Sequence, residues 1–261
     1  MIQPRFYTTQ LQAGLGLLDE TRQLLQVYQP GMAASQLYDA ALASGRFPLV
    51  TARRLRNIVV ECFAPRYLRD PEVVKQLKLL VESFTTVELN QLLFIYTARA
   101  NLVLADFVRE VYWARYSAGR NDLDLEDART FVANSVREGK TQKPWSETTI
   151  KRISSYLMGC CADYGLLATT GRSQRSITAY RILPRVAAYL AYELKFSGLG
   201  DNQIVASPDW ELFGLEHADV REQLKRLSLQ GLLIFQAASD VVHIGWTYKS
   251  MEELIDVIAQ S

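Results

Sequence analysis

The sequence has few residues of the kinds that build disulfide frameworks and metal sites. Its 261 residues include three cysteines, Cys62, Cys160 and Cys161, and two histidines, His217 and His243. An odd number of cysteines, two of them adjacent, gives neither a disulfide framework nor a Cys-x-x-Cys redox motif. No cysteine and histidine lie together at the spacing of zinc ligands. We therefore expect neither a metal nor another cofactor.

Long apolar runs are also absent. No run approaches the ~20 residues that span a bilayer, although 49% of the residues are apolar. The start, MIQPRFYTTQLQAGLG, lacks the apolar centre and the small-residue cleavage site of a signal peptide. We expect a cytoplasmic protein that does not bind a membrane, long enough for one large domain or two to three small ones.

The motifs of common enzyme classes are missing as well. The chain has no GxxxxGK[ST], no GxGxxG after a strand and no GxSxG, so nothing predicts a nucleotide cradle or a nucleophile elbow. The acidic residues Asp124, Glu126 and Asp127 stand at a polar helix start, where capping explains them. The sequence therefore predicts a protein that is not an enzyme.

Charge is present, and it is unevenly distributed. Residues 140–185 carry eight cations and two carboxylates, a net charge of +6, whereas residues 186–261 carry five cations and eleven carboxylates, a net charge of −6. Residues 1–139 are nearly balanced, with sixteen cations and fifteen carboxylates. Such asymmetry indicates partners rather than a fold. One basic segment and one acidic segment are expected to meet different partners.

The first 120 residues are predicted to be helical throughout. Helical periodicity, short connections and the absence of strand-like alternation favour an all-α bundle. The expected helices cover residues 17–28, 34–43, 50–62, ending ahead of Pro65, 71–83, 87–101 and 102–116.

After residue 120 the pattern changes to helices followed by short β-prone runs. A helix over 125–137, a polar loop and a helix from Ser146 lead into LLAT and ITAYRI, which TGRSQRS joins. This is the order of a winged helix. The order repeats from Pro184 with helices over 184–196, 207–215 and 216–230, then QGLLIF and VVHIGWTY, and a last helix over 251–259. Tyr164-Gly-Leu-Leu and Gln230-Gly-Leu-Leu fall at the same place in the two copies, 66 residues apart.

The predicted fold class is therefore mainly α, an N-terminal helical bundle followed by two winged-helix-like units, each a helix-turn-helix plus a β-hairpin. The expected domains are an all-helical one over 1–120, a basic unit over 121–183 and an acidic unit over 184–261.

The helix from Ser146 is the first candidate for binding nucleic acid. Ser146 is a good N-cap, and the apolar residues Ile150, Ile153 and Leu157 share one face. The opposite face is expected to carry hydroxyls, which allow close approach to a groove, and cations, which reach phosphates or base edges. The candidates for the major groove are Thr148, Thr149, Lys151, Arg152 and Ser155. An ordinary solvated helix face is the alternative interpretation.

Further cations lie before this helix, on the hairpin tip and in the bundle. Lys140 and Lys143 precede the helix, and Arg172 and Arg175 lie on the carboxylate-free tip GRSQRS, so all four are candidates for contacts to the DNA backbone. The cluster Arg53, Arg54 and Arg56 in TARRLRN is a candidate second contact, or a solvated helix face.

The N-terminal half resembles a known family. The segment YTTQLQAGLGLLDETRQLL contains Ala13, Gly14, Leu17, Leu18, Glu20, Thr21 and Arg22, and a later helix start contains Thr51, Ala52, Arg53 and Arg54. These stretches resemble the BrxA proteins of BREX phage-exclusion loci. The resemblance implies a small non-enzymatic, DNA-binding component of a bacterial phage-defence system, acting beside other BREX-locus proteins such as a methyltransferase and an ATPase. It supplies no catalytic residues.

The residues and the resemblance together predict double-stranded DNA binding, mainly through phosphates. Two alternatives remain open. The protein is a docking scaffold in a multi-protein defence complex, which the acidic C-terminal unit favours, or its helical bundle binds RNA. The RNA alternative is weakened because no exposed aromatic platform with basic neighbours is evident.

Overall fold

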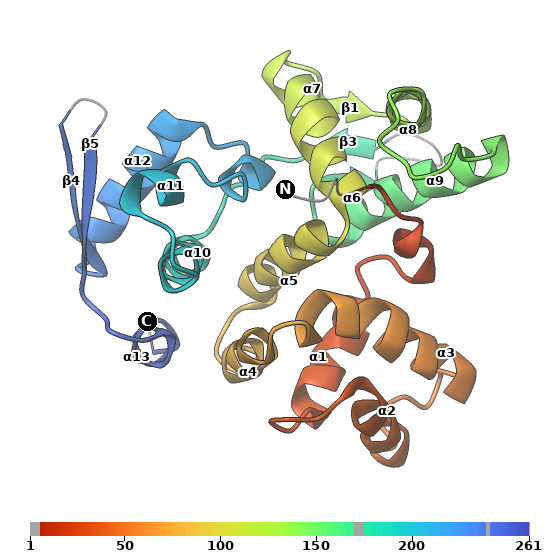
Figure 1. The fold of residues 1–261 in the computed structure, drawn as a ribbon, viewed down its shortest axis with the longest axis horizontal. Helices are drawn as coiled ribbons and strands as arrows, with labels where there is room; N and C mark the ends of the chain where they lie inside the picture. Colours follow the sequence, from red (N-terminus) through yellow and green to blue (C-terminus); the bar gives the residue numbers. More distant parts are fainter. Residues whose placement is uncertain (1–5, 170–174, 239–240, 261) are drawn as a thin grey trace. The chain divides into compact units, whose positions relative to one another are not determined.

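The computed structural model describes residues 6–169, 175–238 and 241–260 (Figure 1). The fold is mainly helical with small antiparallel sheets, which confirms the helical fold class. The chain divides into two compact units. Unit 1 comprises residues 1–78 and 93–180, and unit 2 comprises residues 79–92 and 181–261. The expected division into domains at residues 120 and 183 stays a prediction.

Unit 1 begins with a series of helices around a buried core. Its fully buried large side chains include Phe63, Tyr67, Phe94, Phe107 and Tyr112. The elements in order are η1 (Gln10–Ala13), α1 (Leu18–Val27), α2 (Ala34–Ala43), α3 (Ala52–Asn57), η2 (Ile58–Leu68), α4 (Pro71–Leu80, whose last residues belong to unit 2), the second half of α5 (Thr86–Ala100), α6 (Leu102–Phe107), η3 (Val108–Tyr112) and α7 (Trp113–Ser117).

The helix expected to stop before Pro65 continues through it. Residues Ile58–Leu68 form a π-helical segment, η2, with Pro65 inside. Proline has no backbone N–H to donate within the segment. The side-chain amide of Gln10 donates to the carbonyl of Glu61, in the same segment, at 3.2 Å, which joins η1 to η2.

The second part of unit 1 combines two helices with a small sheet. Its elements are β1 (Asp122–Leu123), α8 (Leu125–Arg137), α9 (Glu147–Asp163), β2 (Leu167–Thr169) and β3 (Arg175–Ile177). The strands are antiparallel in the order β1-β3-β2, with Asp122 opposite Ser176 and Leu167 opposite Ile177. The expected hairpin is present, although of the run ITAYRI the residue Ile177 alone lies in a strand.

Unit 2 has helices first and a hairpin last. Its elements after the start of α5 are α10 (Pro184–Phe196), α11 (Asp201–Val205), η4 (Trp210–Phe213), α12 (His217–Leu229), β4 (Leu233–Ala238), β5 (Val241–Trp246) and α13 (Met251–Ile258). Trp210, Tyr189 and Tyr192 are fully buried in it. Pro184 occupies the first helical turn of α10, where its missing N–H is harmless.

The repeated Gly-Leu-Leu string has the same conformation in both copies. Gly165 after α9 and Gly231 after α12 have positive φ angles of 83° and 75°. The N–H groups of the following Leu166 and Leu232 each bond to a carbonyl five residues earlier, at 2.8 and 3.1 Å. Both helices therefore end in the same glycine-based cap, and each leads into a hairpin.

Among the described residues, no single helix is both long and apolar enough to cross a bilayer.

Candidate nucleic-acid interface

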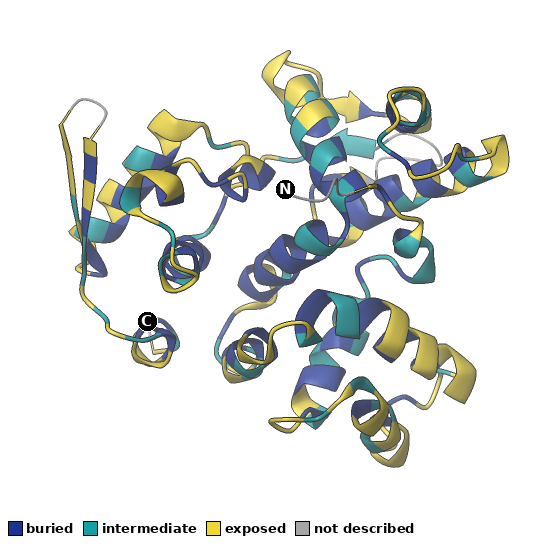
Figure 2. Cartoon of the chain, viewed as in Figure 1, coloured by how far each residue is buried: buried dark blue, intermediate teal, exposed yellow. Residues whose placement is uncertain are grey.

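Helix α9 presents its two faces as the sequence predicts. Ile150, Ile153 and Leu157 are buried, whereas Lys151 and Arg152 are exposed (Figure 2). Thr148 and Ser155 are exposed on the same side as the two cations, and Thr149 and Tyr156 are half-buried at its flank. The amphipathic assignment of α9 is confirmed.

The start of α9 is fixed by a side-chain cap. The hydroxyl of Ser146 accepts a hydrogen bond from the backbone N–H of Thr149 at 3.3 Å and lies 3.0 Å from the Thr149 hydroxyl. The hydroxyl of Ser155 donates to the carbonyl of Lys151 at 3.0 Å. The hydroxyls of Thr149 and Ser155 are thus oriented by contacts within their own helix and its cap. Each of these oxygens can still accept a further hydrogen bond.

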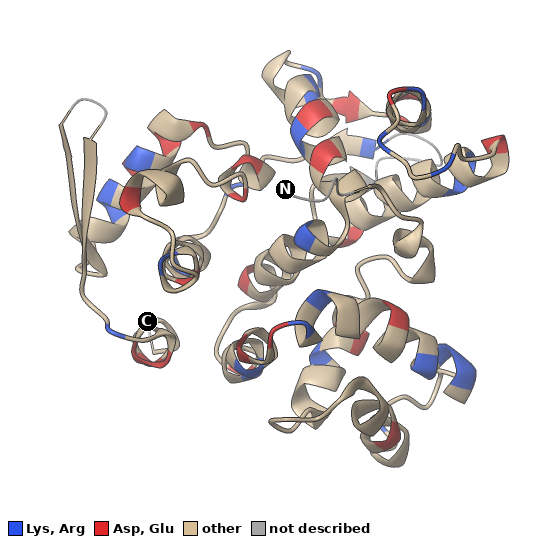
Figure 3. Cartoon of the chain, viewed as in Figure 1, with Lys and Arg blue, Asp and Glu red and all other residues tan. Residues whose placement is uncertain are grey.

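The cations on the exposed face of α9 and just before it have no ion pair with a described residue. Lys143, Lys151 and Arg152 are exposed, and none forms an ion pair with another residue that the structure describes. Figure 3 shows that the first part of α9 carries Lys and Arg, with one acidic position, Glu147, at its very start. An unpaired cation does not have to give up an ion pair within the protein when it binds a phosphate. These three side chains therefore form an exposed positive group in this part of unit 1.

Lys140 is already paired within the protein. Its ammonium lies 3.3 Å from a Glu110 carboxylate oxygen and 3.7 Å from one of Glu138. It also lies 5.9 Å from the centre of the Tyr7 ring, and its carbonyl accepts the N–H of Tyr7 at 2.8 Å. A contact from Lys140 to DNA would have to compete with these two carboxylates.

The two arginines expected on the hairpin tip have different outcomes. Arg172 lies outside the described residues. Arg175 lies in β3, and its guanidinium donates to the carbonyl of Met158 in α9 at 2.5 Å. Arg175 therefore joins the hairpin to the middle of α9 and is half-buried rather than projecting from a loop.

The arginine cluster of α3 is also divided. Thr51 caps the helix by accepting the N–H of Arg54, and Arg53, Arg54 and Arg56 are all exposed. Arg54 donates to the carbonyl of Ala13 at 2.6 Å, so its guanidinium holds the N-terminal segment. Arg53 and Arg56 have no ion pair with a described residue and remain the accessible members of the cluster.

The structure brings together several residues that sequence reasoning did not connect. Arg66 is buried, and its guanidinium donates to the carbonyls of Gly14 at 2.8 Å and Gly16 at 3.3 Å. A carboxylate oxygen of Asp163, at the end of α9, accepts the N–H of Gly16 at 3.0 Å. The segment between η1 and α1 is thereby fastened to both η2 and α9. A single arginine in the apolar run IVVECFAPRYL is the signal that could have predicted a buried, hydrogen-bonded guanidinium.

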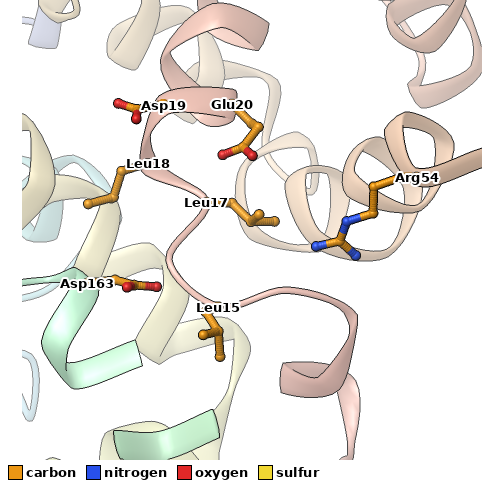
Figure 4. A pocket seen from close by; sticks show the side chains of 7 residues that line it. All are labelled: Leu15, Leu17, Leu18, Asp19, Glu20, Arg54 and Asp163. Atoms are coloured by element: carbon orange, nitrogen blue, oxygen red, sulfur yellow. The ribbon is translucent and has the colours of Figure 1, made fainter. Parts of the chain in front are cut away.

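An open pocket of about 430 Å³ lies beside the fastened segment (Figure 4). Arg54 reaches it from α3 and Asp163 from α9. Its lining residues are Leu15, Leu17, Leu18, Asp19, Glu20, Arg54 and Asp163. Leu17 has a left-handed conformation with φ of 50°, which is uncommon for a residue other than glycine.

The cysteines are packed inside the protein. Cys62, Cys160 and Cys161 are free and buried. Burial raises the pKa of the Cys160 thiol to about 12, despite the opposing charge of Arg66. Among the described residues, no group of three or more His, Cys, Asp or Glu side chains is placed to hold a metal ion.

Comparisons with known proteins place the chain in a family. The family model BrxA matches residues 5–193. A crystal structure of an uncharacterized protein from Magnetospirillum magneticum has a TM-score of 0.58 and 17% sequence identity, covering 74% of this chain and 95% of that chain. At this identity the likeness shows a shared fold. No curated protein matches the sequence. The chain belongs to the BrxA family, and this membership supports a role as a component of a BREX phage-defence system.

Proposed function

We propose that this protein is a non-enzymatic, double-stranded DNA-binding component of a BREX system, which binds mainly through phosphates and works in the cytoplasm beside other BREX-locus proteins. The observation that carries the proposal is the unpaired, exposed set of Lys143, Lys151 and Arg152 on and before α9.

The order of elements in unit 1 supports a winged-helix assignment. A helical segment, α6 to α7, precedes β1, then α8 and α9 form a consecutive pair, and β2 and β3 complete a sheet in the order β1-β3-β2. In a helix-turn-helix, the second helix enters the major groove. In this interpretation α9 is that second helix, and the β2–β3 hairpin is the wing.

The side-chain geometry supports a groove-facing role for α9. Its exposed face combines short hydroxyl side chains, Thr148 and Ser155, with Lys151 and Arg152. Short side chains let the helix approach the bases, while the longer cations reach phosphates or guanine edges. Arg175 is the link that holds the wing against α9, since it donates to the Met158 carbonyl.

The intramolecular contacts rank the twelve proposed DNA-binding residues. Lys143, Lys151 and Arg152 are proposed as primary phosphate contacts, and Arg53 and Arg56 as a second contact. Lys140, Arg54 and Arg175 already have protein partners. Thr148, Thr149 and Ser155 are proposed to face the groove, and Arg172 remains a candidate from the sequence.

The second candidate function is protein docking by the C-terminal winged-helix-like unit. Helices α10, α11 and α12 followed by the β4–β5 hairpin repeat the order of unit 1. The sequence from Val186 onward carries a net charge of −6, which repels phosphates. We propose that this part contacts proteins rather than nucleic acid.

Fluorescence anisotropy with a ~20 bp duplex at several salt concentrations tests the DNA proposal. Each phosphate contact contributes a slope of about −0.9 to log K against log salt. The variant Lys151→Ala/Arg152→Ala should lower the steepness by about 2 and weaken binding about 60-fold at ~0.1 M salt.

The matched control is Lys225→Ala/Arg226→Ala. It removes the same pair of residue types from exposed positions of α12 and should leave the slope unchanged. Absence of wild-type binding at ~50 mM salt, where screening is weak, would refute DNA binding. The exposed face of α9 would then be assigned to protein docking.

A further inference from the structure

The connection between α2 and α3 carries an exposed apolar turn. The N–H of Val50 donates to the carbonyl of Phe47 at 3.1 Å, which closes a turn with Pro48 and Leu49 at its tip. Phe47 is buried, whereas Leu49 is 97% exposed. Pro48 is exposed as well. A leucine side chain therefore projects almost entirely into solvent from unit 1.

The backbone that presents Leu49 is held on both sides. The hydroxyl of Ser44 donates to a carbonyl in the last turn of α2 at 2.7 Å, and the hydroxyl of Thr51 caps α3 directly after the turn. Pro48 has a restricted φ angle, and the buried side chain of Phe47 anchors the residue before it. A side chain presented by a fixed backbone loses less conformational freedom when it binds. Leu49 is thus suited to insertion into a partner.

The charges around this turn are all positive. Between Asp39 and Glu61 the chain has no carboxylate and a net charge of +4. The four cations are Arg46, Arg53, Arg54 and Arg56. Arg53 and Arg56 lie three residues apart on one side of α3, and neither forms an ion pair with a described residue. Figure 3 shows the positive charge at the start of α3. Charge complementarity therefore selects an anionic partner for this surface.

The guanidinium of Arg46 is oriented without being neutralised. Its Nη1 atom donates to the side-chain oxygen of Gln26, an uncharged residue, at 2.7 Å. Arg46 precedes Leu49 by three residues and Arg53 follows it by four, so both Cα atoms lie within about 15 Å of the Leu49 Cα. The leucine thus has cations on both sides along the chain. We define the wedge surface as Arg46, Pro48, Leu49, Arg53 and Arg56.

This combination of side chains fits the minor groove of double-stranded DNA. Proteins that bend DNA insert leucine or proline between base steps from the minor groove, and they use arginine to hold the groove and its phosphates. The minor groove is ~6 Å wide, so the phosphates that border it lie within reach of arginines only a few residues from the inserted side chain. Burial of a leucine that is 97% exposed in the free protein removes apolar surface from water and helps to offset the cost of unstacking.

A membrane surface is also anionic, but a single leucine anchors a protein poorly. One myristoyl chain, which has far more carbon atoms than a leucine side chain, gives only marginal membrane binding. A kinked base step, in contrast, can be opened by one inserted side chain. DNA is also the ligand proposed for the unpaired cations of α9, which lie in the same unit. The wedge surface therefore fits DNA better than lipid.

We propose that Leu49 is a DNA wedge, which enters the minor groove between two base pairs and kinks the duplex, while Arg46, Arg53 and Arg56 contact the phosphates beside the kink. The proposal rests on the DNA binding proposed for unit 1 and adds a change in the shape of the DNA. Wedges of this kind kink the duplex by about 20–90°. Binding and bending are separate measurements, so the two proposals can fail separately.

Fluorescence resonance energy transfer between dyes at the ends of a ~30 bp duplex rich in TA steps, which kink easily, measures bending. Anisotropy of the same duplex at several salt concentrations measures binding. Saturating wild type should raise the transfer efficiency, because a kink brings the ends closer together. Leu49→Ala should keep the salt slope, since it removes no charge, and abolish the rise in transfer. An exposed leucine makes few contacts within the protein, so this variant should fold.

Two controls and one charge variant complete the test. Leu49→Met keeps a long apolar side chain and should still bend the duplex. Leu229→Ala removes a leucine of α12 that is 88% exposed and should leave the bend unchanged. Arg53→Ala/Arg56→Ala should lower the steepness of the salt slope by about 2, whereas Arg53→Lys/Arg56→Lys should preserve it.

A wild type that binds with a steep salt slope but leaves the duplex straight would overturn the wedge and leave DNA binding by α9 standing. A bend that persists in Leu49→Ala would overturn the wedge too. Absence of binding at ~50 mM salt would overturn both proposals. Sedimentation with phosphatidylglycerol vesicles would then identify the partner: vesicle binding that Leu49→Ala abolishes assigns the wedge surface to lipid, and no vesicle binding assigns it to an acidic protein.

Discussion

Breaking the ion pair between Glu88 and Arg185 by removal of one partner is expected to destabilise unit 2. The Nε and Nη2 atoms of Arg185 lie 2.7 and 2.6 Å from the two carboxylate oxygens of Glu88. The side chains are 17% and 10% exposed for Arg185 and Glu88. Arg185 also donates to the carbonyl of Ile258 at 2.8 Å and lies 4.7 Å from the centre of the Phe84 ring. The pair thus connects the start of α5 with α10 and the end of α13.

Removal of one partner should be costly because it leaves the other charge buried. For Arg185→Met we expect a loss of about 3–5 kcal/mol in the free energy of unfolding, which corresponds to a fall in Tm of about 6–20 °C for a chain of this size. Glu88→Gln should cost a similar amount. The double variant should cost clearly less than the sum of the two single variants, because neither unpaired charge remains.

The assay is thermal and urea unfolding, monitored by tryptophan fluorescence. Trp210 and Trp246 report on the unfolding of unit 2. The control is Lys225→Met, which breaks a pair with Glu222 whose side chains are 54% and 61% exposed. That loss should stay below about 1 kcal/mol. Additive effects of the Glu88 and Arg185 changes, or a cost no larger than that of the control, would refute the reasoning.

The same pair gives a pH dependence with a definite sign. Burial alone would raise the pKa of Glu88, but hydrogen bonds from Arg185 and Thr85 outweigh it and lower the pKa below the ordinary value of 4.5. A carboxyl whose folded pKa is lower than its unfolded pKa stabilises the protein above the unfolded pKa. The stability difference between wild type and Arg185→Met should therefore shrink as the pH falls below 4.5.

Two further predictions concern α9 and the buried thiols. Ser146→Ala removes the N-cap of α9 and should cost about 1 kcal/mol while also weakening DNA binding. Ser250→Ala removes the equivalent cap of α13, whose hydroxyl accepts the Glu253 N–H, and should lower stability without changing DNA binding; equal effects on binding would contradict the role of α9. Burial raises the pKa values of Cys62, Cys160 and Cys161. Ellman's reagent at pH 8 should therefore react with the three thiols slowly in the native protein and at once in denaturant, and rapid native labelling would contradict their burial.

Most helix positions could be predicted from the sequence because local signals determine them. The exceptions in unit 2 are α11 (Asp201–Val205), which was not expected, and the helix expected over 207–215, which is a 3-10 helix over Trp210–Phe213. Pro184 and Phe196 were expected as the limits of a helix, and α10 has those limits. The apolar face of α9 followed from a 3.6-residue period, and Ile150, Ile153 and Leu157 are buried as expected. The Gly-Leu-Leu repeat was visible as a short string, and it corresponds to two identical helix ends.

Long-range contacts could not be predicted from the same signals. The continuation of η2 through Pro65 was not expected, and the hydrogen bond from Gln10 to the Glu61 carbonyl joins η2 to a residue far away in the chain. Strand β1 has two residues, Asp122 and Leu123, and is defined by its pairing with β3 rather than by its own sequence. Exposure, hydrogen bonding and ion pairing also separate cations that look alike in sequence. Lys140 and Lys151 differ because Glu110 and Glu138 come close to Lys140.

The division of α5 between the two units has a consequence for synthesis of the chain. Residues 79–92 belong with residues 181–261, yet the ribosome makes them about 90 residues earlier. At ~5–20 residues per second, the interval is on the order of 5–20 s. During it, the apolar Leu89 and Leu92, which end fully buried, have none of their final partners from unit 2. Glu88 likewise waits for Arg185. The nascent chain therefore exposes an apolar segment in its middle. Unit 2 can complete its core after its last helix has emerged.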